Sequence, residues 1–373
     1  MAEHGHGPKR PAKPGQSLPK PSPTQDAHDT RSQQLSPRAA ELARAVRLIT
    51  RICRIAGDPQ FIKRAHRYLT RRGVRAAIVQ HDSSLLFEWL MESLSFRGIA
   101  NRVATYYMQL HGRVCAEQVA HGLDQSPTCP KLQSYWHFAG CGYRKAARRC
   151  AEPSHFPRCP LPSHDLRNGG LNQTAYSLFL FIRDIADGDL VAWIDARLTA
   201  AERALPADRP TAFRSALLPP FGEICGISSK VASMTLSILL LAADRDRPLW
   251  IEAGGVLIAV DTLVHNFLHR TGLIAGLGAP HPYGARCYLP GGCAEIIDRL
   301  AAQIDVRRFN PEFPAYFPRF VQLAIWRFCA SDEFDECNGN QIDDRASCSR
   351  RECPVFRLCA HVPLKPERRQ SRD

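Results

Sequence analysis

The placement of cysteine constrains this chain more than any other feature. Nine of its 14 cysteines fall in two short stretches, residues 124–169 and 329–362, and both interrupt helical sequence patterns. Long irregular segments inside a compact domain need something to hold them, and thiolates gathered around a metal do so. The N-terminus shows no apolar secretory signal, so metal ligation explains the grouped cysteines better than a disulfide framework does.

Length, charge and hydropathy narrow the class of protein. A chain of 373 residues suggests about two domains. Lys and Arg number 49 against 36 Asp and Glu, and this +13 excess favours a polyanionic partner such as nucleic acid. The longest uncharged apolar stretch is the 13 residues from Val231 to Ala243, short of the ~20 that a membrane helix needs. We expect a monomer without a membrane partner in the cytoplasm, nucleoid-associated if bacterial and nuclear if eukaryotic.

Hydrophobic periodicity predicts an all-α fold. Residues 1–38 contain seven prolines and almost no large apolar residues, which is typical of a disordered tail. From residue 39 onwards apolar residues recur at helical spacing, and strand-like alternation is weak throughout. We expect further helices over these segments: 61–73, 84–111, 176–198 and 224–242.

Residues 221–242 are typical of a helical hairpin. A short helix ends near Glu223, and a long apolar helix follows from about Ser229. The connection presents backbone N–H groups at a helix N-terminus, which suits one DNA phosphate. The residues expected to make this contact are Gly226, Ile227, Ser228 and Ser229. Further on, Asp261 stands at a predicted helix start, where the helix dipole favours a carboxylate.

Ile224–Ala232 followed by Val260-Asp261-Thr262 resembles the helix-hairpin-helix DNA glycosylase superfamily, in particular the endonuclease III-like members with an iron–sulfur loop. Their pattern is Leu-Pro-Gly-Val-Gly-x-Lys-x-Ala, then Val-Asp-Thr or Val-Asp-Val. The resemblance covers most of residues 81–362. Ser228 replaces the second glycine, which predicts strain if φ is positive there. The separation of Lys230 from Asp261 is longer than usual, which predicts an extra loop around 245–254.

The resemblance implies a two-domain helical fold. A six-helix barrel domain would span 81–261, with the hairpin at 221–242 and a Cys-rich insertion at 124–169. A second helical domain would combine 39–80 with 262–373 and carry the Cys-rich iron–sulfur loop. The tail, 1–38, would precede both.

The resemblance also implies base-excision repair of double-stranded DNA. Such enzymes flip a damaged or mismatched base out of the duplex. Asp261 would stabilise the oxocarbenium-like sugar or activate the nucleophile, and Lys230 would form a Schiff base at C1′ that allows abasic-site lyase activity. Arg97 and Asn101 would approach DNA from the early barrel helix. The alternatives are a monofunctional glycosylase and a non-catalytic helix-hairpin-helix DNA-binding protein.

Two cysteine groups are candidate metal sites. Cys337, Cys348, Cys353 and Cys359 have spacings x10, x4 and x5, and the family loop closes with the same x5 spacing. We interpret them as ligands of a [4Fe–4S] cluster, with zinc as the alternative. The internal group, Cys129, Cys141, Cys150 and Cys159, either holds a second metal or lines a metal-free insertion. The remaining cysteines, which include Cys287 and Cys293, are expected to be buried as small apolar residues.

Overall fold

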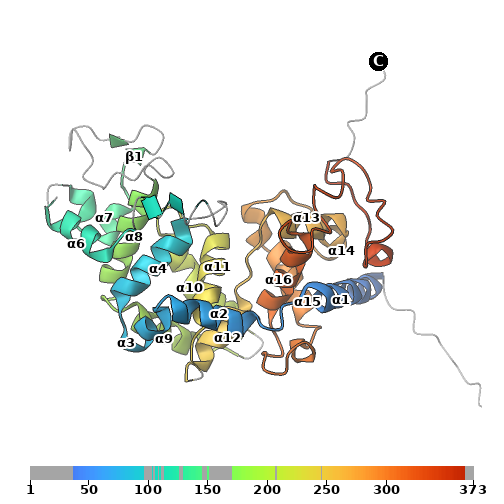
Figure 1. Cartoon of the computed structure of the whole chain (residues 1–373), viewed down its shortest axis with the longest axis horizontal. Coiled ribbons are helices and arrows are strands. Elements are labelled where there is room, and N and C mark those ends of the chain that lie inside the picture. Colours follow the sequence, from blue (N-terminus) through green and yellow to red (C-terminus); the bar gives the residue numbers. More distant parts are fainter. Residues whose placement is uncertain are drawn as a thin grey trace, which may run out of the picture. The chain divides into compact units, whose positions relative to one another are not determined.

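In the computed structural model the chain is mainly helical, with one short pair of strands (Figure 1). The residues described by the structure are 37–95, 103, 106–107, 109–110, 113–125, 129–144, 149–150, 170–205, 208–244 and 246–365. Nearly all of the predicted tail, Arg97, Asn101, Cys159 and much of the predicted insertion lie outside these ranges.

In chain order, a first group of elements ends at residue 222 and a second group follows. The first group is α1 (Pro37–Ala56), α2 (Phe61–Arg71), α3 (Val74–Gln80), α4 (Ser83–Ser95), α6 (Ala116–Gln125), η1 (Pro130–Leu132), α7 (Tyr135–Phe138), β1 (Tyr143–Arg144), β2 (Arg149–Cys150), α8 (Gly170–Asp184), α9 (Leu190–Glu202) and α10 (Arg209–Gly222). The second group is α11 (Ser229–Leu241), α12 (Pro248–Val256), α13 (Thr262–Arg270), α14 (Leu273–Leu277), η3 (Ala285–Tyr288), α15 (Cys293–Ala301), η4 (Val306–Arg308), α16 (Pro318–Cys329) and η5 (Phe356–Leu358). No helix among the described residues is long and apolar enough to span a bilayer.

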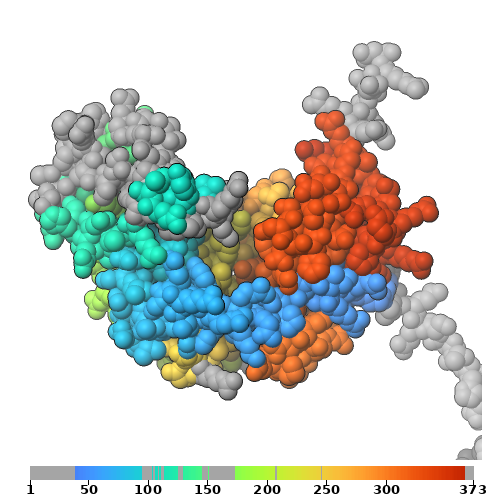
Figure 2. Space-filling model, viewed as in Figure 1, coloured from blue at the N-terminus to red at the C-terminus, as the bar shows by residue number. Residues whose placement is uncertain are grey.

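Two hydrophobic cores organise these helices. The first core is built around α11, in which nine of thirteen residues are buried. The second core is built around α16, in which nine of twelve residues are buried. A helix that is buried on most of its sides must be surrounded by other elements, and α11 and α16 are the central helices of their cores. α16 packs against α1, α13 and α15, and Figure 2 shows the blue N-terminal residues lying directly against the orange C-terminal ones.

The N-terminal helices divide between the two cores earlier than the sequence indicated. α1 and Phe61 belong to the second core, as the predicted division after residue 80 requires. Ala65, Leu69 and the buried residues of α3 instead belong to the first core. The reason is that α2 packs on α11 and α3 packs on α4, so the chain passes from one core to the other within α2.

Two predicted segments differ in detail. The helix expected over 176–198 is broken between α8 and α9, where Asp187 and Gly188 both have positive φ and Asp189 caps α9 through the Ala192 N–H at 2.9 Å. The loop expected around 245–254 is mostly α12, because Trp250 and Ala253 are buried against the first core. The close approach of α12 to α11 depends on Gly254, where a Cβ atom would lie 2.9 Å from the Leu241 nitrogen.

Candidate catalytic and metal-binding sites

The predicted helical hairpin is formed by α10, a six-residue connection and α11. Ile224 and Ile227 anchor the connection in the first core, and Gly226 adopts a φ of 81°, which glycine tolerates. Ser177 Oγ accepts the Cys225 N–H at 3.0 Å, and Thr174 donates to the Cys225 carbonyl at 2.8 Å. The connection is therefore held by α8 as well as by its own two helices.

Ser228 and Ser229 are exposed at the start of α11. Ser228 has φ −98° and ψ 159°, so the strain predicted from its replacement of a glycine is absent at this described position. Within the described part of the chain, the N–H groups of Gly226, Ser228 and Ser229 donate to no protein acceptor. These three donors can bind an anion without breaking an existing hydrogen bond.

Lys230 and Asp261 occupy two helix starts. Lys230 is the second residue of α11 and is half-buried. Asp261 caps α13, since its carboxylate accepts the Val264 N–H at 3.0 Å, and it is also half-buried. No hydrogen bond or ion pair joins the two side chains, both of which the structure describes, so each remains available to a third group.

A buried cation accompanies Asp261. The Arg319 side chain lies in the second core, and burial lowers its pKa to about 10, while the negative charges of Tyr288 and Asp261 act in the opposite direction. Its guanidinium donates to Gln322 and lies 5.8 Å from the Phe61 ring centroid. On the other side, burial and the charge of Asp261 raise the pKa of Tyr283. Asp261 thus lies within electrostatic range of a buried arginine and of Tyr283.

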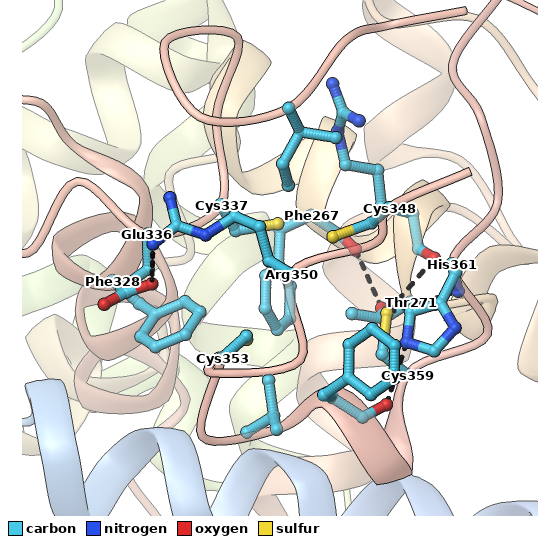
Figure 3. Close-up of a pocket in the computed structure, with 14 residues that line it drawn as sticks. Phe267, Thr271, Phe328, Glu336, Cys337, Cys348, Arg350, Cys353, Cys359 and His361 are labelled. Atoms are coloured by element: carbon cyan, nitrogen blue, oxygen red, sulfur yellow. Dashed lines mark hydrogen bonds and ion pairs between the residues drawn. The ribbon is translucent and has the colours of Figure 1, made fainter. Parts of the chain in front are cut away.

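The four predicted C-terminal cysteines all line one cavity with about 380 Å³ of empty space, part of it open to solvent. Figure 3 shows the sulfur atoms of Cys337, Cys348 and Cys359 turned toward a common space. Cys329 is not one of the lining residues, although its thiol is hydrogen-bonded to that of Cys337. The loop that carries the cysteines is fastened to the end of α13, because the Val362 N–H donates to the Arg270 carbonyl at 2.8 Å.

This cavity contains donors that lack acceptors. Arg270 is 2% exposed and pairs with Asp344, but its Nε and Nη1 atoms have no partner. The His361 N–H already donates to the Cys359 sulfur at 3.3 Å. Unpaired buried guanidinium hydrogens are costly, so an anionic group that accepts hydrogen bonds is the occupant that this cavity fits.

The internal cysteine group is described in part. Burial raises the pKa of the Cys129 thiol, and nearby Cys141 and Cys150 add to that rise. Gln173 donates to the Tyr143 carbonyl at 3.2 Å and lies 3.7 Å from the Cys141 sulfur, which ties β1 to α8. Three of the four predicted residues are therefore near neighbours, and Cys159 is outside the described ranges.

A third group was not predicted as a metal site from the sequence. The ligand atoms of His265, His281, Cys287 and Cys293 all lie within 4.8 Å of one another, and three of the residues are buried. Cys287 and Cys293 are buried, as expected, and the His/Cys group that they form with the two histidines could also bind a metal. A hydrogen bond from Cys293, reinforced by His265, lowers the pKa of the Cys287 thiol to about 4 and raises that of Cys293. The available signal was the x5 spacing of Cys287 and Cys293 downstream of two histidines.

Comparison of the chain with protein-family models, with curated proteins and with solved structures finds no match. Its function must therefore be inferred from the arrangement of its own residues. The chain carries a hairpin with unpaired N–H groups among its described residues, a half-buried lysine, a helix-capping aspartate and a His/Cys group that could bind a metal.

Proposed function

We propose that this chain is a base-excision DNA glycosylase that acts on double-stranded DNA, with abasic-site lyase activity through Lys230. The observation that carries the proposal is the pair of helix starts described above. Lys230 follows the hairpin in the first turn of α11, and Asp261 caps α13 beside the buried Arg319. The order of hairpin, lysine and aspartate is that of the endonuclease III-like glycosylases, which the sequence resembles.

The chemistry assigns a role to each side chain. The Nζ electron pair of Lys230 attacks the sugar C1′ as the N-glycosidic bond breaks, and the base leaves with the bonding electrons and then takes up a proton. Asp261 stabilises the positive charge that develops on the sugar. The C1′–O4′ bond then breaks, the ring oxygen takes up a proton as the lysine nitrogen loses one, and a ring-opened imine forms. This imine loses a proton from C2′ and the phosphate at C3′, which nicks the strand. Water releases Lys230 by hydrolysing the imine.

DNA would reach these residues through the hairpin. The free N–H groups of Gly226, Ser228 and Ser229 would hold one phosphate close to Lys230. The net charge of +13 supplies the wider attraction, so affinity is expected to fall steeply as salt is raised.

The cavity beside α13 would hold a [4Fe–4S] cluster through Cys337, Cys348, Cys353 and Cys359. A cluster with four thiolates is anionic, and the unpaired Arg270 donors fit its inorganic sulfides. A single tetrahedral ion would need its four sulfurs about 3.8 Å apart. Among the described residues, these four cysteines do not form a group close enough to hold a single metal ion. In this role the cluster is structural, because it holds the loop at residues 336–361 against the end of α13.

The decisive experiment is an excision assay on duplexes that carry oxidised, alkylated, deaminated or mismatched bases. We expect Asp261→Asn to lower excision by about 10²–10³-fold, because asparagine keeps the helix cap but removes the charge. Asp189→Asn is the matched control, since Asp189 caps α9 with the same geometry. Absence of excision by the wild type would contradict a glycosylase and favour the DNA-binding alternative. Equal excision by the two variants would contradict the role of Asp261.

Borohydride trapping on abasic DNA tests the lyase step separately. We expect a covalent complex with the wild type and none with Lys230→Ala, because borohydride reduces the imine that Lys230 forms. Lys63→Ala, which alters an exposed lysine paired with Glu312, should trap normally. Excision without trapping would identify a monofunctional glycosylase.

A further inference from the structure

The His/Cys group of the second core is assembled from four separate elements. His265 lies in α13, His281 in the loop after α14, Cys287 in η3, and Cys293 is the first residue of α15. His265 Nδ1 lies 3.3 Å from the Cys293 sulfur and 3.6 Å from the Cys287 sulfur. His281 Nε2 lies 3.3 Å from the Cys293 sulfur.

These distances match the edges of one coordination tetrahedron. Zinc–nitrogen bonds of about 2.0–2.1 Å and zinc–sulfur bonds of about 2.3 Å, at tetrahedral angles, place nitrogen and sulfur about 3.5–3.6 Å apart. Two imidazoles and two thiolates are also a donor set that zinc prefers. We propose that His265, His281, Cys287 and Cys293 bind one structural zinc ion.

The surroundings of the ligands support a metal at this position. His281 Nδ1 donates to the Ala279 carbonyl at 2.7 Å, which leaves Nε2 without a proton and directed at Cys293. Metal-bound histidines are commonly oriented by such a second hydrogen bond. Cys293 is the first residue of α15, so the helix fixes the position of its sulfur beside the two histidines.

The site is closed, which indicates a structural role. Cys287 and Cys293 are fully buried, and His265 is 6% exposed. Two thiolates neutralise the dication, so the ion can lie in an apolar core without an unpaired charge. The four protein ligands complete the tetrahedron and leave no position for water or substrate.

A zinc ion at this position would fasten the loop between α14 and α15 to α13. The Tyr288 hydroxyl accepts the Val260 N–H at 2.9 Å on the same side. The loop carries Tyr283, which is 45% exposed and lies in the field of Asp261. Zinc would thereby hold an exposed aromatic side chain beside the start of α13, whatever reaction the protein catalyses.

Metal analysis of the full-length protein, purified without chelators, tests the site. We expect one zinc per chain, with an X-ray absorption spectrum that fits two sulfur and two nitrogen neighbours. Cys293→Ala should lose the zinc and keep its iron. Cys53→Ala, which alters a buried lone thiol in the same core, should keep both metals.

His281→Ala provides a second route, because His281 is half-buried on a loop and its loss should not prevent folding. This variant should also lose zinc, and its loop at residues 278–292 should become sensitive to protease. Wild-type protein without zinc would overturn the proposal. So would zinc retained by both variants, or a spectrum with four sulfur neighbours, which would place the ion in another cysteine group. None of these readouts depends on glycosylase activity.

Discussion

The second core contains two groups of potential metal ligands. Each group includes a pair of cysteines with the same spacing, but the two pairs lie in different surroundings. Cys287 and Cys293 are separated by five residues, as are Cys353 and Cys359. The first pair belongs to a compact group within 4.8 Å, whereas the second lines a cavity of about 380 Å³. The difference arises from the flanking structure, since Cys293 starts α15 against α13, while Cys359 follows η5 in a loop. This difference is why we propose a single ion for the compact group and a larger cluster for the cavity.

α13 lies between these two groups. Asp261 caps its first turn, His265 faces the compact group, and Arg270 at its last turn lines the cavity. A substitution in one group can therefore be compared directly with a substitution in the other, because both groups contact the same nine-residue helix, α13.

The largest effect should come from removing a cavity cysteine. Cys353→Ala is expected to lose most of its iron and brown colour, because the cluster would lose one of its four thiolates, and its zinc should stay. Iron and zinc content measured on the same sample distinguish the two groups. Cys329→Ala is the control, since Cys329 touches Cys337 but does not line the cavity. Iron lost from Cys329→Ala and kept by Cys353→Ala would reverse the ligand assignment.

A smaller effect is expected from Arg270→Met. Breaking its pair with Asp344 should lower the free energy of unfolding by about 2 kcal/mol, less than the ~3–5 kcal/mol for a fully buried pair, because the carboxylate is 36% exposed and can rehydrate. Iron should also be lost faster in air, since the cluster would lose its hydrogen-bond donors. Arg214→Met removes a similar pair with Asp298 elsewhere and should destabilise the protein without faster iron loss. Equal rates of iron loss from Arg270→Met and Arg214→Met would show that Arg270 does not stabilise the cluster.

The smallest effect on metal content is expected from a substitution beside the compact group. At Gly292 a Cβ atom would lie 2.4 Å from the Arg286 carbonyl oxygen and 2.8 Å from two others. Gly292→Ala should therefore displace the turn before Cys293, lower stability by about 1–3 kcal/mol and weaken zinc retention. Gly222→Ala meets nothing within 4 Å and should leave both unchanged or slightly raise stability. The measurements are chemical unfolding and zinc content. Equal stability and equal zinc content of the two variants would contradict the predicted clash at Gly292.

Sequence reasoning performed best where the signal is local. The boundaries of α10 and α11 agree with the hairpin predicted from the apolar pattern, and the four C-terminal cysteines were singled out because they fall within 23 residues. α12 was missed because charged residues precede it and two glycines lie near its end, and only the burial of Trp250 reveals its helical face. The break between α8 and α9 depends on two residues with positive φ, which the periodicity of apolar residues in the sequence does not reveal.

The compact group could not be predicted in this way. Its ligands come from four elements, and the spacing from His265 to His281 is set by how α14 packs rather than by any local preference. Placing these side chains requires the tertiary structure. Hydrophobicity correctly predicted that Cys287 and Cys293 are buried, but it cannot distinguish a buried ligand from a buried apolar cysteine, because the two have equal exposure.

Because α1 packs on α16, the second core cannot close until both helices have been synthesised. Roughly 260 residues separate them, which corresponds to roughly 13–52 s of translation. The first core needs no residue beyond about Leu257 and can fold during that interval. The apolar face of α1 must meanwhile remain uncovered or be shielded by a chaperone. Both metal sites lie in the core that closes later, so metal loading is expected to follow synthesis rather than guide it.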